Sequence, residues 1–182
     1  MAHITQPERA AARVALLGGE SSGKTTLARA LAVRYGTLWV PEYLREFTES
    51  HGRPPLEPEQ LQVARIQVER ERQAWRQADG FLFCDTTPLM IAIYSDFCFG
   101  RIDADLERLA QSHRYDFTIV TAPDIAWVAD GLQRASDEVR QAIHRAVLAR
   151  LQAAGISYLL ACGSLENRLR QAASYLQNRV LP

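Results

Sequence analysis

The stretch VALLGGESSGKTTLARAL, from Val14 to Leu31, places an apolar run, a turn rich in glycine and serine, and a helical pattern next to one another. Its centre matches the motif G-x-x-x-x-G-K-[ST], with Gly18, Gly23, Lys24 and Thr25 in the defining positions. The apolar run is typical of a buried strand, and the segment after the turn is typical of an amphipathic helix. Lys24 is the only lysine in the chain, so a chance match is hard to defend.

A turn of this kind predicts a binding site for the phosphates of ATP. Backbone N–H groups at a helix N-terminus have no partner within the helix, and the helix dipole adds positive potential there. We expect Lys24 to reach the β- and γ-phosphates and Thr25 to place its hydroxyl on Mg²⁺. The predicted ATP-binding residues are Gly18, Gly19, Glu20, Ser21, Ser22, Gly23, Lys24, Thr25 and Thr26.

Short apolar segments alternate with helical patterns along the whole chain. This order predicts an α/β, three-layer P-loop NTPase fold, with a five-stranded parallel sheet and helices on both faces. Strands are expected at 14–17 and within 38–42, 81–85, 115–123 and 156–163. Helices are expected at 24–36, at 58–79 with Leu61, Ala64, Val68 and Trp75 along one stripe, at 137–155, and at 164–176 behind a Ser164 cap.

Length and composition predict one domain over residues 1–182, with a flexible tail at 1–12 and a lid at 124–138. Acidic and basic side chains balance at 21 each, which argues against nucleic acid or an anionic membrane as a partner. The 3 cysteines lack metal or redox spacing, and no apolar run approaches the roughly twenty residues of a membrane span. We expect a cytoplasmic protein that acts on a small-molecule nucleoside substrate. Whether it forms a homo-oligomer stays open.

Acidic residues follow the predicted strands, at the sheet edge where α/β proteins bind their ligands. Asp85 ends the run FLFCD and has the form of a Walker B acid, which holds the metal or accepts a proton; the alternative is an aspartate that caps the turn before Pro88. Glu42, in PEYLREF, is expected to hold sugar hydroxyls or to act as the base; the alternative is a solvated helical turn shared with Arg45.

The segment WVADGLQRASDEVR, at 127–140, has the mixture of residues that suits a lid. Arg134 and Arg140 are expected to close over the phosphates, neutralise charge in the transition state and exclude water. The alternative is a polar loop whose Trp127 packs on the core.

Four segments, GGESSGKTTL, PEYLREF, FCDT and WVADGL, occur in the order and at the separations found in one kinase group. In these segments the chain resembles the ribosylnicotinamide kinase domain of NadR-like proteins, from about Val14 to the final helix. The resemblance implies transfer of phosphate from ATP, with Mg²⁺, to the ribose 5′-hydroxyl of nicotinamide riboside in pyridine nucleotide salvage. Pro41 and Gln133 depart from the group, which has an aromatic residue and an arginine at these positions.

The resemblance also implies roles for individual residues. Lys24 and Thr25 match the phosphate and metal groups, Asp85 matches the strand-end acid that joins Thr25 at the metal, and Asp130 matches the start of the lid. The implied catalytic set is Lys24, Asp85, Glu42, Arg134 and Arg140, and the implied acceptor-binding set is Glu42, Tyr43, Arg45, Trp127 and Asp130.

Two other functions fit the same motifs. One is a kinase for another nucleoside or hydroxylated metabolite, because sequence fixes phosphate chemistry better than the shape of an acceptor pocket. The other is a nucleotide-dependent switch ATPase with a protein partner. The lid arginines and the acids at the strand ends favour transfer. Whether Glu42 or Asp85 is the base, and whether Arg134 or Arg140 contacts phosphate, stays open.

Overall fold

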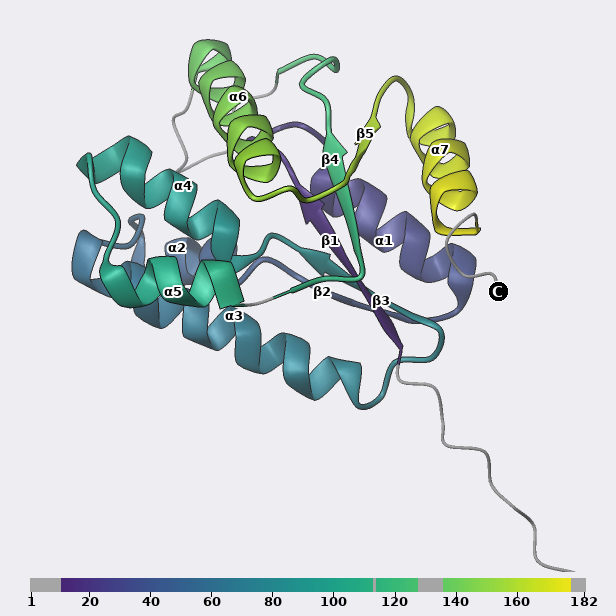
Figure 1. Ribbon diagram of the computed structural model, residues 1–182, viewed down its shortest axis with the longest axis horizontal. Helices are drawn as coiled ribbons and strands as arrows, with labels where there is room; N and C mark the ends of the chain where they lie inside the picture. The colour runs from purple at the N-terminus through teal and green to yellow at the C-terminus, as the bar shows by residue number, and fades with distance from the viewer. Residues whose placement is uncertain (1–10, 113, 128–135, 178–182) are drawn as a thin grey trace, which may run out of the picture.

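The computed structural model describes residues 11–112, 114–127 and 136–177, and these form a parallel sheet with helices on both faces (Figure 1). The sheet is five-stranded with the order β2-β3-β1-β4-β5. Neighbouring strands pair in parallel, as at Leu16, which lies opposite Asp85 on one side and Ile119 on the other. The strands are β1 (Ala12–Leu17), β2 (Leu38–Val40), β3 (Phe81–Asp85), β4 (Phe117–Thr121) and β5 (Leu159–Ala161).

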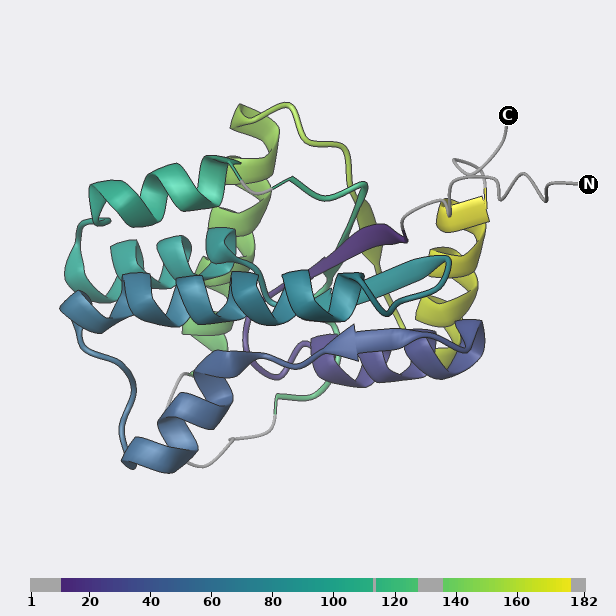
Figure 2. The ribbon, with the colours of Figure 1, turned by 90° about the horizontal axis from the view of Figure 1, so that it is seen from below.

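Helices connect the strands and cover both faces of the sheet. Helices α1 and α7 lie on one face, while α3, α4 and α6 lie on the other (Figure 1). The short helix α2 follows β2 and packs against α3 (Figure 2). The helices are α1 (Lys24–Tyr35), α2 (Tyr43–His51), the 3₁₀ turn η1 (Glu57–Glu59), α3 (Gln60–Trp75), α4 (Pro88–Phe99), α5 (Ala104–Ser112), α6 (Asp137–Ala153) and α7 (Leu165–Gln177).

The core has two halves because successive side chains of a strand point to opposite faces. Val14 and Leu16 of β1 pack with α1 and α7. Ala15 and Leu17 pack with α4 and α6. The predicted three-layer fold is therefore confirmed, and the carboxyl ends of β1, β3 and β4 meet at one edge of the sheet.

Each strand expected from the sequence is present, but three helices were not predicted. Helix α4 carries apolar residues all round and is largely buried, so it shows little of the one-sided pattern on which the prediction relied. Its ends do carry signals, since Pro88 stands in the first turn and Gly100 is the left-handed cap residue. The short helices α2 and α5 each bury only one or two residues.

Three sequence predictions need correction. Ala11 and Ala12 are not part of a tail, because Ala11 is buried and accepts a hydrogen bond from the Trp75 indole, while Ala12 begins β1. Residues 137–138 are not lid but the first turn of α6, capped by Ser136. The stripe expected for α3 needs correction in part: Ala64 is buried, and Leu61 and Trp75 pack against the core, but the buried residues of the helix also include Gln60, Val63, Gln67 and Glu71.

Residues 1–10 and 128–135, which hold most of the predicted tail and lid, lie outside the described residues. Among the described helices, none has the length and apolar character needed to cross a bilayer.

Candidate active site

The predicted phosphate-binding turn links the end of β1 to the first turn of α1. Gly18 has a φ of 146°, and a Cβ placed there would lie 2.4 Å from Oγ1 of Thr121 at the end of β4. Gly23 is the N-cap of α1 with a φ of 84°, and it has no side chain to cap the first amides of the helix. The loop is therefore closely packed against β4, while the amides at the start of α1 are left for an anion.

Lys24 begins α1 and is buried, with 9% of its surface exposed. Its ammonium donates a hydrogen bond of 3.3 Å to the carbonyl oxygen of Gly19, within the same turn. A buried lysine beside the backbone of such a turn is the arrangement expected where a bound phosphate balances the charge of the ammonium.

Two buried arginines hold the backbone of this turn from outside, and the first is Arg140. Its guanidinium donates to the carbonyl oxygens of Ser21, at 3.2 Å, and Ile125, at 2.9 Å, and pairs with Asp137 at 2.5 Å. Only 4% of Arg140 is exposed. Arg140 stands on α6, within the helix expected at 137–155, and its donors bind the backbone of the turn. Its expected contact with phosphate stays a prediction.

The second arginine, Arg168 of α7, was not identified from the sequence. Its guanidinium donates to the carbonyl oxygens of Ser22, Ala122 and Gly163, and it pairs with Asp124 at 2.5 Å. It is 3% exposed. Because it joins the turn to the residues that follow β4 and β5, Arg168 ties three strand ends together, and Asp124 serves as its counter-ion.

Thr25 and Asp85 form the predicted metal pair. The Thr25 hydroxyl donates a hydrogen bond of 2.5 Å to Oδ2 of Asp85, which is fully buried at the end of β3. Oδ1 of Asp85 is buried too and has no hydrogen-bond partner among the described residues. Burial raises the pKa of Asp85 to about 6, the Lys24 charge acts in the opposite direction, and the Glu42 charge raises it further.

This donor set fits a magnesium ion. A buried carboxylate oxygen without a partner, beside a hydroxyl, offers the hard oxygen ligands that Mg²⁺ prefers. No group of three or more His, Cys, Asp or Glu side chains suited to a metal occurs among the described residues. A cation here would therefore complete its shell with phosphate oxygens and water, as Mg²⁺ does in nucleotide sites.

Glu42 lies next to this pair. It is the N-cap of α2, and its Oε1 accepts a hydrogen bond of 3.0 Å from the hydroxyl of Thr86, which follows Asp85 in the chain. Thr86 has a φ of 71°, an uncommon conformation for a β-branched residue and one that concentrates at functional sites. The strained residue thus turns its hydroxyl to Glu42 and links the two acids predicted at the strand ends.

The other predicted residues fall into three groups. Tyr43 and Arg45 lie in the first turn of α2, and the Arg45 charge opposes the rise in the pKa of Asp85, which places Arg45 near that carboxylate. Trp127 follows β4 and is 38% exposed, so it is not packed into the core. Asp130 and Arg134 lie outside the described residues.

The sequence is similar to a known domain family and to proteins of known function. A family model described as an AAA domain matches residues 13–168. The trifunctional NAD biosynthesis/regulator protein NadR of Salmonella typhimurium (strain LT2) is 29% identical over 151 residues, which are 80% of this chain and 37% of the relative. NadR of Escherichia coli (strain K12) is 31% identical over 130 residues, or 69% of this chain and 32% of the relative. The chain thus spans about a third of the length of these relatives.

Solved structures show the same fold. A NadR protein in complex with NR superposes with a TM-score of 0.80 at 20% identity, covering 96% of this chain and 53% of that protein. A deoxyadenosine kinase from M. mycoides superposes with a TM-score of 0.65 at 10% identity, covering 91% and 99%. Since the family model spans most of the sequence, the chain belongs to the AAA domain family, with the NadR proteins among its relatives.

Proposed function

We propose that this protein is a small-molecule kinase that transfers the γ-phosphoryl group of ATP to a hydroxyl of a nucleoside-like acceptor, with nicotinamide riboside as the preferred acceptor. The observation that carries the proposal is the juxtaposition of Asp85 and Glu42. Asp85 accepts a hydrogen bond from Thr25 of the phosphate-binding turn, and Glu42 accepts one from Thr86, the residue that follows Asp85. One acid is thus available to the nucleotide and its metal, and the other to an acceptor.

The phosphate-binding turn supplies the nucleotide half of the site. The amides at the start of α1 and the ammonium of Lys24 bind the phosphates, while Arg140 and Arg168 keep the turn in shape. Thr25 and Asp85 are the residues that would hold Mg²⁺, which supplies positive charge to the phosphates when bound. The Walker B role of Asp85 is favoured over the turn cap, because one of its buried oxygens is left for a ligand.

Transfer then needs a hydroxyl oxygen in line with the γ-phosphorus. A bond forms between these two atoms as the bond from the γ-phosphorus to its bridging oxygen breaks, which releases ADP. The hydroxyl proton passes to a carboxylate, either Glu42 or Asp85. Glu42 lies at the N-terminus of α2, where it can also accept hydrogen bonds from the hydroxyls of a sugar.

The segment that follows β4 and precedes α6 completes the proposal. Trp127 follows β4 with an exposed ring that can stack on an acceptor base. We assign Asp130 and Arg134, through the resemblance to NadR-like proteins, to the acceptor and the phosphates. With Arg140 bound to the turn, Arg134 is the lid arginine of this proposal.

Nicotinamide riboside is favoured because the sequence relatives are NadR proteins of NAD biosynthesis, and a NadR protein with the same fold was solved with NR bound. The proposal therefore places the reaction in pyridine nucleotide salvage in the cytoplasm and leaves the oligomeric state open. The deoxyadenosine kinase of like fold makes other nucleosides the first competitors. A panel of nicotinamide riboside, adenosine, deoxyadenosine, cytidine and uridine, with ADP release as the readout, ranks these acceptors.

A pair of substitutions tests the division between the two acids. Asp85→Asn should weaken Mg²⁺-dependent ATP binding as well as transfer, whereas Glu42→Gln should leave ATP binding nearly intact and raise the acceptor KM or abolish transfer. Each lost interaction with a charged partner is worth about 1.5 to 3 kcal/mol, or roughly ten- to a hundredfold. Matched controls are Asp79→Asn and Glu49→Gln, which replace exposed acids just before β3 and on α2. If Glu42→Gln changes nothing, the acceptor does not bind at α2.

A further inference from the structure

We propose that Gln67 is a positioning residue for the acceptor half of the site: with Glu71, it fixes the first amide of α2 and thereby the place of Glu42. The inference rests on the proposed function, in which Glu42 binds or deprotonates the acceptor. It assigns a role to two buried polar side chains of α3 that do not themselves face the phosphate-binding turn.

The polar stripe of α3 is unusual for its burial. Gln67 and Glu71 are each 1% exposed, and they stand one helical turn apart on the side of α3 that faces the protein interior. Burying an amide and a carboxyl group costs free energy unless both are hydrogen-bonded. Apolar residues would pack at these positions without that cost. The presence of polar side chains therefore indicates that their hydrogen bonds have a role.

Gln67 binds the start of α2. Its Oε1 accepts a hydrogen bond of 2.9 Å from the backbone N–H of Tyr43, the first residue of that helix. The first amides of a helix have no partner within the helix, and no side chain caps α2 through its N-cap residue. Gln67 supplies the missing acceptor from a neighbouring helix. Since Tyr43 directly follows Glu42, this bond fixes the backbone that carries the Glu42 side chain.

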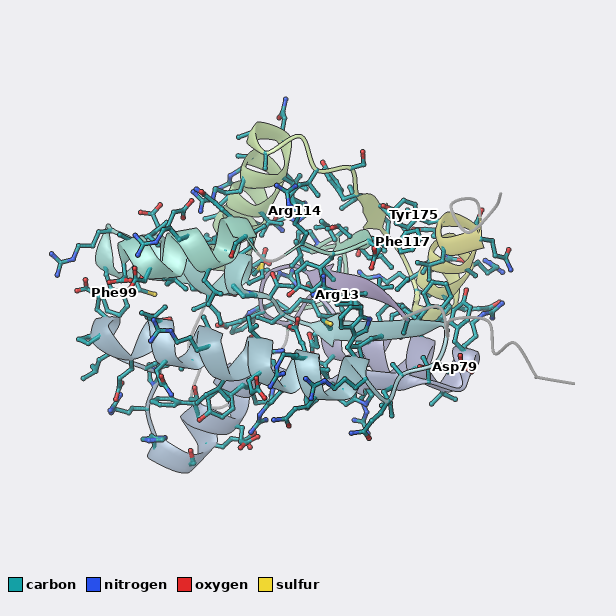
Figure 3. All side chains as sticks on the ribbon, turned by 60° about the horizontal axis from the view of Figure 1, so that its bottom comes forward. Arg13, Asp79, Phe99, Arg114, Phe117 and Tyr175 are labelled. Carbon is teal, nitrogen blue, oxygen red and sulfur yellow. The ribbon has the colours of Figure 1, made fainter. Side chains whose placement is uncertain are left out.

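Glu71 holds the other end of the Gln67 amide. Gln67 Nε2 donates to Oε1 of Glu71 at 3.3 Å, and the Tyr115 hydroxyl donates to Oε2 of Glu71 at 2.8 Å. The guanidinium of Arg13 on β1, a residue labelled in Figure 3, lies 5.7 Å from the centre of the Tyr115 ring. The chain of hydrogen bonds thus runs from Tyr115, just before β4, through Glu71 and Gln67 to the first residue of α2.

Glu42 is therefore held from two directions. On one side its backbone neighbour is bound to Gln67, and on the other its carboxylate accepts the hydroxyl hydrogen bond of Thr86. A hydrogen-bonding or catalytic carboxylate must be placed within about 0.5 Å of its productive position, which needs support of this kind around it. The phosphate-binding turn is held separately by Arg140 and Arg168.

Helix α2 has a second attachment to α3, which is independent of Gln67. It allows the placing of Glu42 to be tested separately from the packing of α2 on α3. Arg70 pairs with Glu46 at 2.6 Å, and its guanidinium lies 4.5 Å from the centre of the Tyr43 ring. These contacts are exposed and hold the helix by its side chains. With Gln67 altered, they keep α2 on the protein while the first amide of the helix loses its partner, so the expected defect is in the placing of Glu42.

The test compares Gln67→Leu with Gln73→Leu in the full chain, with nicotinamide riboside as the acceptor. Gln73 lies on the exposed side of α3, where its amide donates a hydrogen bond of 2.8 Å to Glu69. We expect Gln67→Leu to lower kcat about tenfold and to raise the acceptor KM, with ATP binding and acceptor-independent ATP hydrolysis within twofold of the wild type. Gln73→Leu should leave all four quantities unchanged.

Two exchanges at Glu71 test whether its oxygen atom is what holds the Gln67 amide. Glu71→Gln keeps an oxygen for the Gln67 amide and should retain wild-type kcat and acceptor KM, whereas Glu71→Leu should share the defect of Gln67→Leu. If Gln67→Leu fails to fold, Gln67→Asn carries the test, because it keeps the amide but is one methylene too short to join Tyr43 and Glu71.

The outcomes separate this inference from the proposed function when Glu42→Gln is measured in the same assay. A defect shared by Glu42→Gln and Gln67→Leu, with ATP binding intact, supports both. A defect in Glu42→Gln with a normal Gln67→Leu overturns the positioning role alone. The positioning role is also overturned if Gln67→Leu loses ATP binding in parallel with transfer, which marks a general loss of structure. A silent Glu42→Gln overturns both.

Discussion

The Thr25 hydroxyl, in the first turn of α1, donates a hydrogen bond of 2.5 Å to Asp85 at the end of β3. This bond joins the phosphate-binding turn of β1 to the strand beside it. It also brings the two predicted metal ligands within reach of one ion, and the second oxygen of Asp85 has no partner among the described residues. The site thus couples a nucleotide-binding turn to a buried carboxylate.

Replacing Thr25 tests this coupling. Thr25→Val keeps the shape of the side chain but removes the hydroxyl, so Mg²⁺-dependent ATP binding should fall about ten- to a hundredfold. Thr25→Ser keeps the hydroxyl and should stay within about threefold of the wild type. Titration with ATP at fixed Mg²⁺ measures both. Equal affinities for the two variants would remove Thr25 from the metal site.

Arg168 should contribute strongly to stability. Arg168→Ala leaves the carbonyl oxygen of Ser22 without its donor and Asp124 without its counter-ion, and we expect the free energy of unfolding to fall by about 3 kcal/mol. Arg170→Ala, two residues along α7, removes an exposed ion pair with Glu166 and should cost less than about 0.5 kcal/mol. Urea unfolding of the two variants makes the comparison, and similar losses would contradict the role of Arg168.

The raised pKa of Glu71 predicts that the stability of the fold depends on pH. Burial raises its pKa from the ordinary value of 4.5 to about 7, against the opposing hydrogen bonds from Tyr115 and Gln67. The folded protein therefore binds this proton more tightly than the unfolded chain, so the stabilisation is full below about pH 4.5 and is lost as the pH rises through 7. Relative to Glu71→Gln, the wild type should lose on the order of 3 kcal/mol between pH 4.5 and 8.

The measurement is urea unfolding of the wild type and Glu71→Gln across this pH range. Other groups titrate in both proteins, so their effects cancel in the difference. A difference in unfolding free energy that does not change with pH would show that Glu71 has the same pKa in the folded and unfolded chain.

The lid assignment makes a kinetic prediction for Arg134. If this arginine meets the charge that develops during transfer, Arg134→Ala should lower kcat by about tenfold or more and change ATP affinity little. Arg145→Ala, on the α6 helix, serves as a control. A variant that loses ATP affinity while keeping kcat would assign Arg134 to ground-state binding of the nucleotide.

The sequence predicted those parts of the fold that depend on local pattern. The G-x-x-x-x-G-K-[ST] turn and the apolar runs on either side of it placed β1 and α1, and the strand-end position of Asp85 placed it near Thr25. These predictions succeed because parallel strands bring their carboxyl ends to one edge of the sheet, whatever the intervening helices do.

The parts that could not be predicted depend on contacts between distant segments. Arg168 and Ser22 lie far apart in the sequence, and nothing near either residue indicates that they meet. The same is true of Gln67 and Tyr43, and the apolar stripe expected for α3 gave no sign that the polar residues Gln67 and Glu71 are buried as well. Arg140 lies within the helix expected at 137–155, but the sequence does not indicate that its guanidinium binds the carbonyl oxygens of Ser21 and Ile125.

The central claim, transfer of phosphate to a nucleoside hydroxyl, is tested most directly by mass spectrometry of the products. The purified chain is incubated with ATP, Mg²⁺ and nicotinamide riboside, and Lys24→Ala, which removes the point charge of the phosphate-binding turn, serves as the inactive control. The account predicts nicotinamide mononucleotide and ADP in equal amounts with the wild type, and little of either with the variant. ADP released together with free phosphate, with nicotinamide riboside unchanged, would contradict it and indicate an ATPase.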